Sequence, residues 1–289
     1  MTELAIRDLR NAPSMLPLFA KAVIRAGVKP GKNPELPAIG ARLSDLVLDA
    51  KHLAGYRKVC GFQSSGTLPI TYPHMHAHPL FMTLLLDQRF PFPAMGLVHV
   101  RNRITQFRPI QEREQLDVEC RFGALEKRDS GYEFSILTSV STAGEQVWES
   151  ESFMLYRTGG GGGKKKEAAQ VEPVQNAKEW SVPGDIGRRY GAVSGDRNPI
   201  HLYPLTAKLF GFKRQIAHGM WSKARCLAEL EPQFPKGPFS VDVNFKLPLF
   251  IPAKVKFASA QVSSGMDFRL LGADGIKPHL AGEIRTLEN

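Results

Sequence analysis

The clearest hydrophobic pattern is an apolar segment followed by four runs in which apolar and polar residues alternate. The segment Leu80–Asp87 is apolar on nearly every side, which is typical of a buried helix, and Pro79 favours a helix start there. Alternation with a period of two is typical of strands with one buried face. The four alternating runs are Leu97–Phe107, Gln115–Leu125, Gly131–Thr142 and Gln146–Arg157. A helix followed by an antiparallel meander predicts an α+β fold.

A second set of elements repeats this order nearer the C-terminus. We expect a helix over His218–Leu230 and then strands over Ser240–Leu247, Ala253–Ser263, Phe268–Ala273 and Lys277–Thr286. The pattern Arg-Ile-x-x-Phe-x-Pro that ends at Pro109 matches the pattern Lys-Leu-x-x-Phe-x-Pro that ends at Pro252, an offset of 143 residues. Two similar halves in one chain predict an internal pseudo-dimer whose sheets join edge to edge.

The stretch Gly159–Lys166 separates the two halves. Its five consecutive glycines adopt many conformations and its three lysines repel one another, so the composition is typical of a linker. A phosphate-binding glycine loop is the alternative, but no strand before and helix after the glycines support it. The sequence therefore predicts an N-terminal half over 1–157, a linker over 158–172 and a C-terminal half over 173–289.

Composition narrows the class of protein. The chain has 289 residues, of which 43% are hydrophobic, and its 38 Lys and Arg exceed its 28 Asp and Glu to give a formal net charge of +10. We find no recognition helix, zinc finger or aromatic RNA-binding motif, so no nucleic-acid partner is expected. An anionic substrate or an acidic partner protein explains the charge instead. The three cysteines are widely spaced and form no CxxC pattern, which favours a reducing compartment.

The N-terminal region does not resemble a signal peptide, because acidic residues and prolines interrupt its basic and apolar parts. No apolar run is long enough to span a bilayer, so we expect no integral membrane segment and a soluble, cytoplasmic protein. Residues 1–30 contain an amphipathic helical segment that either lies on a membrane surface or packs on the main body. Packing is favoured, through Leu16, Leu18, Phe19 and Val23.

Three alternating histidines, His74, His76 and His78, raise the question of a metal site. On an extended strand they would share one face, but Pro73 and Pro79 bracket the segment and no acidic or cysteine ligand is close in sequence. We therefore predict no metal in this protein.

The stretch Ser194–His201 is the strongest candidate for a functional site. It begins with a Ser-Gly-Asp sequence that favours a turn, and Pro199 keeps the residue before it out of the helical region. Asp196 and His201 are therefore expected on one loop. Farther along, Gly219 is expected at a helix N-terminus, where a ligand can approach free amides that favour negative charge. A carboxylate, an imidazole and such amides are typical of proton transfer next to a carbonyl.

The spacing of these residues resembles a family motif. The sequence Tyr190…Ser-Gly-Asp196-x-Asn-Pro-Ile-His201…His-Gly219-Met is similar to the hydratase motif of MaoC-like (R)-specific enoyl-thioester hydratases. The resemblance implies the hot-dog fold, a curved antiparallel sheet wrapped around one long helix, so the two halves predict a double hot dog. Many members carry an acidic residue two places after the motif histidine, where this chain has Tyr203, a difference that bears on substrate choice.

The resemblance also implies an activity, namely reversible hydration of trans-2-enoyl thioesters to (R)-3-hydroxyacyl thioesters without a cofactor. Asp196 and His201 would form the acid/base pair, and the Gly219 amide would bind the thioester carbonyl. The thioester would be carried by coenzyme A or by an acyl carrier protein. Further positions expected to bind the substrate or shape its loop are Ser194, Asn198, His218 and Met220. His218 either sets the catalytic pair in place or packs beneath Trp221.

The N-terminal half is expected to lack the acid/base pair, because the 143-residue offset places Leu53 and Lys58 opposite Asp196 and His201. That half would then be a binding and scaffolding half.

Two alternatives to the hydratase function stay open. One is a hot-dog thioester hydrolase, which usually carries its carboxylate on the long helix, where this chain offers only Glu229. The other is a non-catalytic acyl-thioester-binding module. A homodimer is also an open expectation.

Overall fold

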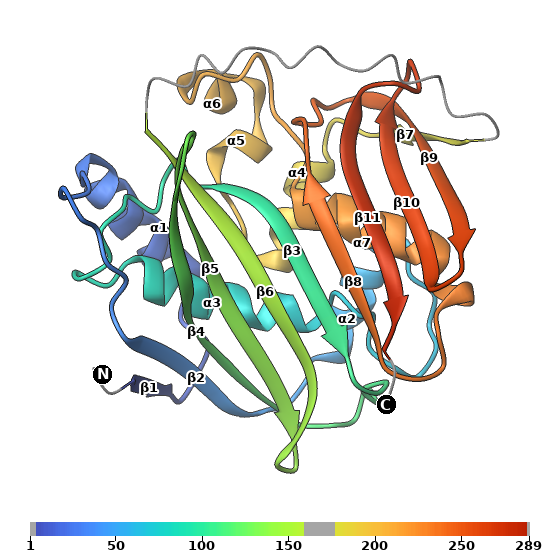
Figure 1. Cartoon of the computed structure of the whole chain (residues 1–289), viewed down its shortest axis with the longest axis horizontal. Coiled ribbons are helices and arrows are strands. Elements are labelled where there is room, and N and C mark those ends of the chain that lie inside the picture. Colours follow the sequence, from blue (N-terminus) through green and yellow to red (C-terminus); the bar gives the residue numbers. More distant parts are fainter. Residues whose placement is uncertain (1–3, 159–176, 288–289) are drawn as a thin grey trace. The chain divides into compact units, whose positions relative to one another are not determined.

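The computed structural model describes residues 4–158 and 177–287, which divide into two compact units (Figure 1). Among these residues, the first unit comprises 4–50 and 66–158, and the second comprises 51–65 and 177–287. The predicted linker over 158–172 lies outside the described residues, apart from Thr158. Each unit is described by itself.

The first unit is a sheet packed on one buried helix. Its strands are β1 (Ala5–Leu9), β2 (Ile39–Leu46), β3 (Val98–Gln106), β4 (Leu116–Arg128), β5 (Gly131–Thr142) and β6 (Glu145–Arg157). They lie in the order β1-β2-β4-β5-β6-β3, and the described pairs are antiparallel except for β1 with β2. The helix α3 (Pro73–Leu85) contacts β2, β4 and β5. The helix α1 (Met15–Ile24) and the 3-10 turn η1 (Arg25–Gly27) connect β1 to β2.

The core of the first unit forms where the inward residues of the alternating strands meet α3. The ring of Phe90 stacks on that of Phe122, with ring centroids 5.2 Å apart, and both contact Phe134. Trp148 is fully buried, and its indole Nε1–H donates to the Ile70 carbonyl at 2.8 Å. These large aromatic side chains remove much apolar surface from water, which stabilises the sheet against the helix.

The helix α3 begins at Pro73, earlier than the start predicted at Pro79. Pro79 lies inside the helix, where it removes one backbone hydrogen bond, but the added turns bury further side chains that compensate. The histidines are thus helical rather than extended. Because successive helical residues are rotated by about 100°, His74 and His78 share a face that His76 does not. The strand geometry that would have gathered all three around a metal is not formed.

The second unit has the same plan with a longer connection before its central helix. Its strands are β7 (Lys178–Val182), β8 (Phe239–Phe245), β9 (Ala253–Val262), β10 (Gly265–Gly272) and β11 (Pro278–Thr286). Its helices are α2 (Ala50–Cys60), α4 (Ile186–Ser194), α5 (Pro199–Leu202), α6 (Pro204–Leu209) and α7 (Gly219–Leu230), with the 3-10 turn η2 (Glu231–Gln233) after α7. The strands lie in the order β7-β9-β10-β11-β8, and all these pairs are antiparallel.

The strand orders show that the chain contains an internal repeat, as the sequence predicts. The order β2-β4-β5-β6-β3 in the first unit corresponds strand for strand to β7-β9-β10-β11-β8 in the second. The hairpin turns also match, since Gly131 begins β5 with a φ of 142° and Gly265 begins β10 with a φ of 144°. A Cβ atom at either glycine would lie 2.0 Å from a carbonyl oxygen of the neighbouring strand. Glycine is therefore required at the same corner of both units.

One boundary of the predicted division is wrong. Residues 51–65 were assigned to the N-terminal half, but they belong to the second unit. Their helix α2 buries Leu53, Tyr56, Arg57 and Cys60, which stand at helical spacing and form one stripe. A hydrogen bond of 2.6 Å joins the Nε2 atom of His52 to the Val193 carbonyl of α4. The buried stripe and this bond explain why α2 packs with the second unit.

The helices α2 and α4 end in the same way and allow the repeat to be aligned. Gly61 follows α2 with a φ of 88°, and Gly195 follows α4 with a φ of 72°. Such left-handed glycines are common just after helix C-termini. With the two glycines aligned, Phe62 stands opposite Asp196.

The same alignment places Thr67 opposite His201. The predicted counterparts Leu53 and Lys58 are therefore wrong, because α5 and α6 add residues before α7 that have no helical counterpart between α2 and α3. The conclusion drawn from them still holds, since neither phenylalanine nor threonine is a usable acid/base group near neutral pH. The N-terminal counterpart of the motif lacks the pair.

The N-terminal helix differs from its prediction at one end. Val23 is 63% exposed and Ile24 is 82% exposed, so the predicted packing of Val23 is wrong. As for membrane spans, every helix in the described part of the chain is too short or too polar to cross a bilayer.

We predict that Gly265→Ala lowers the free energy of unfolding by roughly 1–3 kcal/mol, the range for a residue forced into a disfavoured backbone conformation. The control is Gly237→Ala in the same unit, where an added Cβ has no neighbour within 4 Å. Urea unfolding followed by circular dichroism measures both. Equal unfolding midpoints for the two variants would contradict the prediction.

Candidate active site

Two glycines on α4 allow the motif loop to lie directly against this helix. A Cβ atom at Gly187 would lie 1.9 Å from the backbone oxygen of His201, and one at Gly191 would lie 2.8 Å from the backbone oxygen of Asp196. The two glycines are one helical turn apart and share a face. The loop therefore approaches the backbone of α4 more closely than any side chain would permit.

Local hydrogen bonds fix the loop after α4. The Asp196 amide donates to the Ser194 hydroxyl at 3.1 Å, and the Asn198 amide donates to Oδ1 of Asp196 at 3.1 Å. The Asn198 side chain in turn accepts from the Ile200 amide at 3.4 Å and caps α5, whose first residue is Pro199. Ser194 and Asn198 thus shape the loop, as the motif predicts. His201 lies on α5 itself rather than on an extended loop.

His201 has a defined tautomer. Its ring is buried, and its Nδ1 atom lies 2.9 Å from the Ile216 carbonyl oxygen. A carbonyl only accepts, so Nδ1–H donates and the neutral ring keeps its lone pair on Nε2. Burial lowers the pKa of His201 below its ordinary 6.5, while the Asp196 carboxylate and the Ile216 carbonyl act in the opposite direction. At neutral pH the imidazole is therefore uncharged, with Nε2 able to accept a proton.

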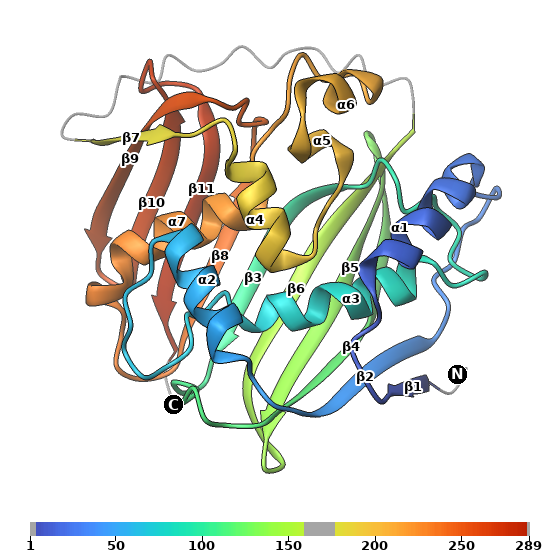
Figure 2. The same ribbon diagram turned by 180° about the vertical axis from the view of Figure 1, so that it is seen from behind.

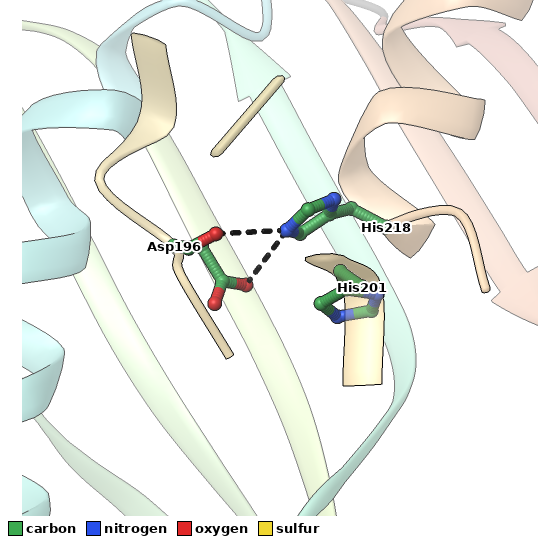
Figure 3. Close-up of side chains that lie close together, drawn as sticks. All are labelled: Asp196, His201 and His218. Atoms are coloured by element: carbon green, nitrogen blue, oxygen red, sulfur yellow. Dashed lines mark hydrogen bonds and ion pairs between the residues drawn. The ribbon is translucent and has the colours of Figure 1, made fainter. Parts of the chain in front are cut away.

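His218 links the two residues of the predicted pair, as Figure 3 shows. Its Nε2 atom donates to the backbone oxygen of Asp196 at 2.9 Å and lies 3.7 Å from the carboxylate Oδ2. Its ring stacks on that of His201, with ring centroids 3.7 Å apart and planes inclined by 27°. Of the two arrangements considered from the sequence, the structure has the one in which His218 bonds the motif loop.

The carboxylate and the two imidazoles together form a compact polar group. One ligating atom from each of Asp196, His201 and His218 lies within 4.8 Å of the other two. A single water molecule can bridge two groups at such a separation with ordinary hydrogen bonds. The side chain of Asp196 is 29% exposed, whereas that of His218 is only 3% exposed.

The same three side chains do not have the geometry of a zinc site. A zinc ion lies in the plane of each imidazole that binds it, about 2.0–2.1 Å from the nitrogen. The rings of His201 and His218 are stacked, and their planes are inclined by only 27°, so the planes do not meet that close to the nitrogens. The arrangement instead suits proton transfer through a shared water.

The helix α7 presents its N-terminus beside the histidines. His218 is the N-cap and Gly219 is the first helical residue, so the Gly219 amide has no acceptor one turn earlier within its own helix. A Cβ at Gly219 would lie 3.1 Å from the Phe245 ring. Met220, a predicted substrate-binding residue, is 6% exposed and packs in the first turn of α7.

Aromatic residues from α2 and α4 support the histidine pair within the second unit. The ring of Tyr190 lies 5.0 Å from that of His218, and the ring of Tyr56 lies 6.4 Å from that of Tyr190. The Trp221 indole donates to the Val59 carbonyl at 3.1 Å and so joins α7 to α2.

Sequence reasoning missed both α2 and the glycines of α4. The helical spacing of Leu53 to Cys60 and the Gly-x-x-x-Gly pattern at Gly187 were the available signals.

Comparisons with known proteins identify the family of this chain. The MaoC like domain model matches residues 165–269. A 3-hydroxyacyl-thioester dehydratase X of Mycobacterium tuberculosis is 33% identical over 280 residues, which cover 95% of this chain and 99% of that protein. An (R)-specific enoyl-CoA hydratase of Aeromonas caviae is 38% identical over 69 residues, which cover 23% of this chain and 52% of that protein.

Solved structures show the same architecture. The crystal structure of HtdX of Mycobacterium tuberculosis, 33% identical, covers 86% of this chain and all of that chain, with a TM-score of 0.76. A MaoC-like dehydratase from Phytophthora capsici, 18% identical, covers 89% of this chain and 97% of that chain, with a TM-score of 0.70. The fold is thus the predicted α+β double hot dog, in which a hydratase motif follows α4. The chain belongs to the MaoC-like dehydratase family.

We predict that Gly187→Ala displaces α5 and lowers the rate of enoyl-thioester hydration by roughly 10²-fold, because a shift of about 1 Å at a catalytic group has effects of that size. The matched control is Gly55→Ala on α2, where the new Cβ would lie at an ordinary 3.5 Å from Val193. Steady-state hydration of crotonyl-CoA measures both. Full activity in Gly187→Ala would show that this contact does not position His201.

Proposed function

We propose that this protein is a hydro-lyase that adds water reversibly to trans-2-enoyl thioesters and yields (R)-3-hydroxyacyl thioesters. The observation that carries the proposal is the shared position of Asp196 and a neutral His201 at the span of one water molecule. The names of the two curated relatives, a 3-hydroxyacyl-thioester dehydratase and an enoyl-CoA hydratase, support this reaction class.

His201 is the proton acceptor in this proposal. Because its Nδ1–H is held by the Ile216 carbonyl, Nε2 accepts a proton from the bound water. The water oxygen then forms a bond to C3 of the substrate. The imidazolium that results is stabilised by the nearby Asp196 carboxylate, which acts to raise the pKa of His201.

Asp196 orients the same water in this proposal. Its carboxylate is fixed by the Asn198 amide, and its backbone oxygen is fixed by His218. These bonds leave the side chain little freedom to turn, so the water is held in one position beside the substrate. His218 is therefore a positioning residue, since it acts through Asp196 and the stacked His201 ring.

Gly219 supplies the electrophilic part of the site. As C3 is attacked, the π electrons of the C2–C3 bond move toward the thioester carbonyl and negative charge develops on its oxygen. The Gly219 amide at the N-terminus of α7 stabilises this charge. The proton on His201 then goes to C2 and the carbonyl re-forms, so the elements of one water molecule have been added across the double bond.

The reaction balances with water and these side chains alone, so the proposal needs no cofactor. The acyl group is carried by coenzyme A or by an acyl carrier protein, and the anionic parts of either match the basic excess of the chain. A homodimer and a cytoplasmic location remain part of the proposal.

We predict that Asp196→Asn and His201→Gln each lower the hydration rate of crotonyl-CoA by about 10²–10⁴-fold, the usual contribution of a general acid/base group. The matched controls are Asp185→Asn, which changes an exposed carboxylate at the start of α4, and His279→Gln. The ring of His279 also bonds a backbone carbonyl, that of Leu247. Both controls should keep activity within about twofold.

The reaction is monitored by the decrease in enoyl absorbance, and chiral analysis of the product checks the (R) configuration. Full activity in either catalytic variant would refute the assignment. Release of free thiol without loss of the enoyl group would identify a thioester hydrolase instead.

We predict that the acid limb of the kcat/KM profile lies below pH 6.5, the ordinary pKa of histidine. Burial lowers the pKa of His201, so its neutral, active form persists to lower pH than that of an exposed histidine. Between the lowered pKa and 6.5 the unfolded chain binds more protons than the folded one, so the free energy of unfolding also decreases as the pH falls through this window. An acid limb above pH 6.5 would contradict the proposed role of His201.

A further inference from the structure

The segment around α6 exposes an unusual number of large apolar side chains. Tyr203 is 51% exposed, Leu205 73%, Leu209 79% and Phe210 42%. Together they are four of the eleven exposed large hydrophobic residues found in the described chain. Scattered apolar residues are ordinary on a surface, but a group on one short helix is typical of a contact site. We call the residues from Tyr203 to Arg214 the α6 face.

The α6 face is also strongly basic. Lys208, Lys213 and Arg214 are exposed on it, and Arg197 is exposed on the catalytic loop before it. From Arg197 to Ala228 the sequence contains no aspartate or glutamate. None of these four cations forms an ion pair with a carboxylate in residues 4–158 or 177–287. The face therefore presents positive charge without local compensation.

The α6 face is joined directly to the catalytic machinery. The helix α6 follows α5, which carries His201, and the Thr206 hydroxyl donates to the Pro199 carbonyl at 2.7 Å. Ala207, on the inner side of α6, is fully buried. Figure 2 shows α6 on the outer side of α5 within the second unit. A molecule bound to this face would lie next to the segment that holds the catalytic histidine.

Resting on the hydration proposed above, we propose that the α6 face is the docking surface for an acidic acyl carrier protein that delivers the enoyl thioester. A carrier protein has an acidic surface that complements Lys208, Lys213 and Arg214, and its apolar side chains can cover Leu205 and Leu209. Apolar centres with charged rims are typical of protein interfaces. The nucleotide of coenzyme A would use the cations but would leave the exposed leucines uncovered.

The test compares three crotonyl thioesters, those of a discrete acidic acyl carrier protein, of coenzyme A and of pantetheine. The variants are Lys208→Glu/Lys213→Glu and Leu205→Ser/Leu209→Ser. The control is Lys236→Glu, which lies after η2, beyond the C-terminal end of α7, whereas α6 precedes its N-terminal end. Pantetheine has neither protein nor nucleotide, so its rate reports the intact chemistry of each variant.

For both α6 variants we expect kcat/KM with the carrier protein to fall by about tenfold or more. Reversing the lysine charges slows association, and replacing the leucines removes the apolar contact with the carrier protein. The pantetheine rate should stay within about twofold, and the control should behave as wild type. Leu205→Ser/Leu209→Ser should also leave the coenzyme A rate unchanged. A higher salt concentration should lower the kcat/KM of the wild type with the carrier-protein thioester more than that with the pantetheine thioester.

Other outcomes would overturn the proposal. Unchanged carrier-protein kinetics in both variants would show that the face is not used for docking. A loss with coenzyme A equal to that with the carrier protein would assign the cations to the nucleotide. If light scattering showed that the leucine variant dissociates an oligomer while its carrier-protein kinetics stay normal, the occupant would be a second copy of this chain. If the wild type hydrated none of the three thioesters, the proposed function itself would be refuted.

Discussion

The hydrogen bond between Nδ1 of His201 and the Ile216 carbonyl determines what the site can do. It places the ring proton on Nδ1 and leaves the lone pair on Nε2. If the ring were turned or its tautomer changed, the same residue could not accept a proton from a water shared with Asp196. Burial reinforces this state by disfavouring the charged ring, so a neutral base is available at neutral pH.

The fold provides this bond by bringing three backbone segments together. The glycines of α4 let the loop lie against the helix, and the residues before α7 supply both the Ile216 carbonyl and the His218 ring. Because the partners are mainly backbone atoms, their positions follow from the packing of α4, α5 and α7 rather than from flexible side chains. The groups to which we assign catalysis are therefore held in place by the fold itself, which is the condition for effective electrostatic catalysis.

Much of this could be predicted from the sequence, because the informative signals were local. Alternating strands and the motif around Asp196 gave the α+β class, the repeat and the residues that the structure brings together. The start of α3 was missed because tertiary burial outweighs the cost of Pro79 inside a helix. The buried stripe of α2 is visible at helical spacing and indicates a helix. The position of α2 was missed because this spacing does not show which segments, distant in sequence, the helix packs against. The Gly-x-x-x-Gly pattern at Gly187 indicates that another segment can approach α4 closely, but it does not identify the His201 backbone as that segment, since the contact depends on the fold of the loop.

The central claim is that Asp196 and His201 act on one water as a single unit. Groups that act together show strongly non-additive effects, whereas independent groups contribute separate factors to the rate. The most direct test is therefore the hydration rate of crotonyl-CoA in Asp196→Asn, in His201→Gln and in the double variant. The account predicts that the double variant is about as slow as the slower single variant. A double variant whose loss equals the product of the two single losses would show independent action and would contradict the account.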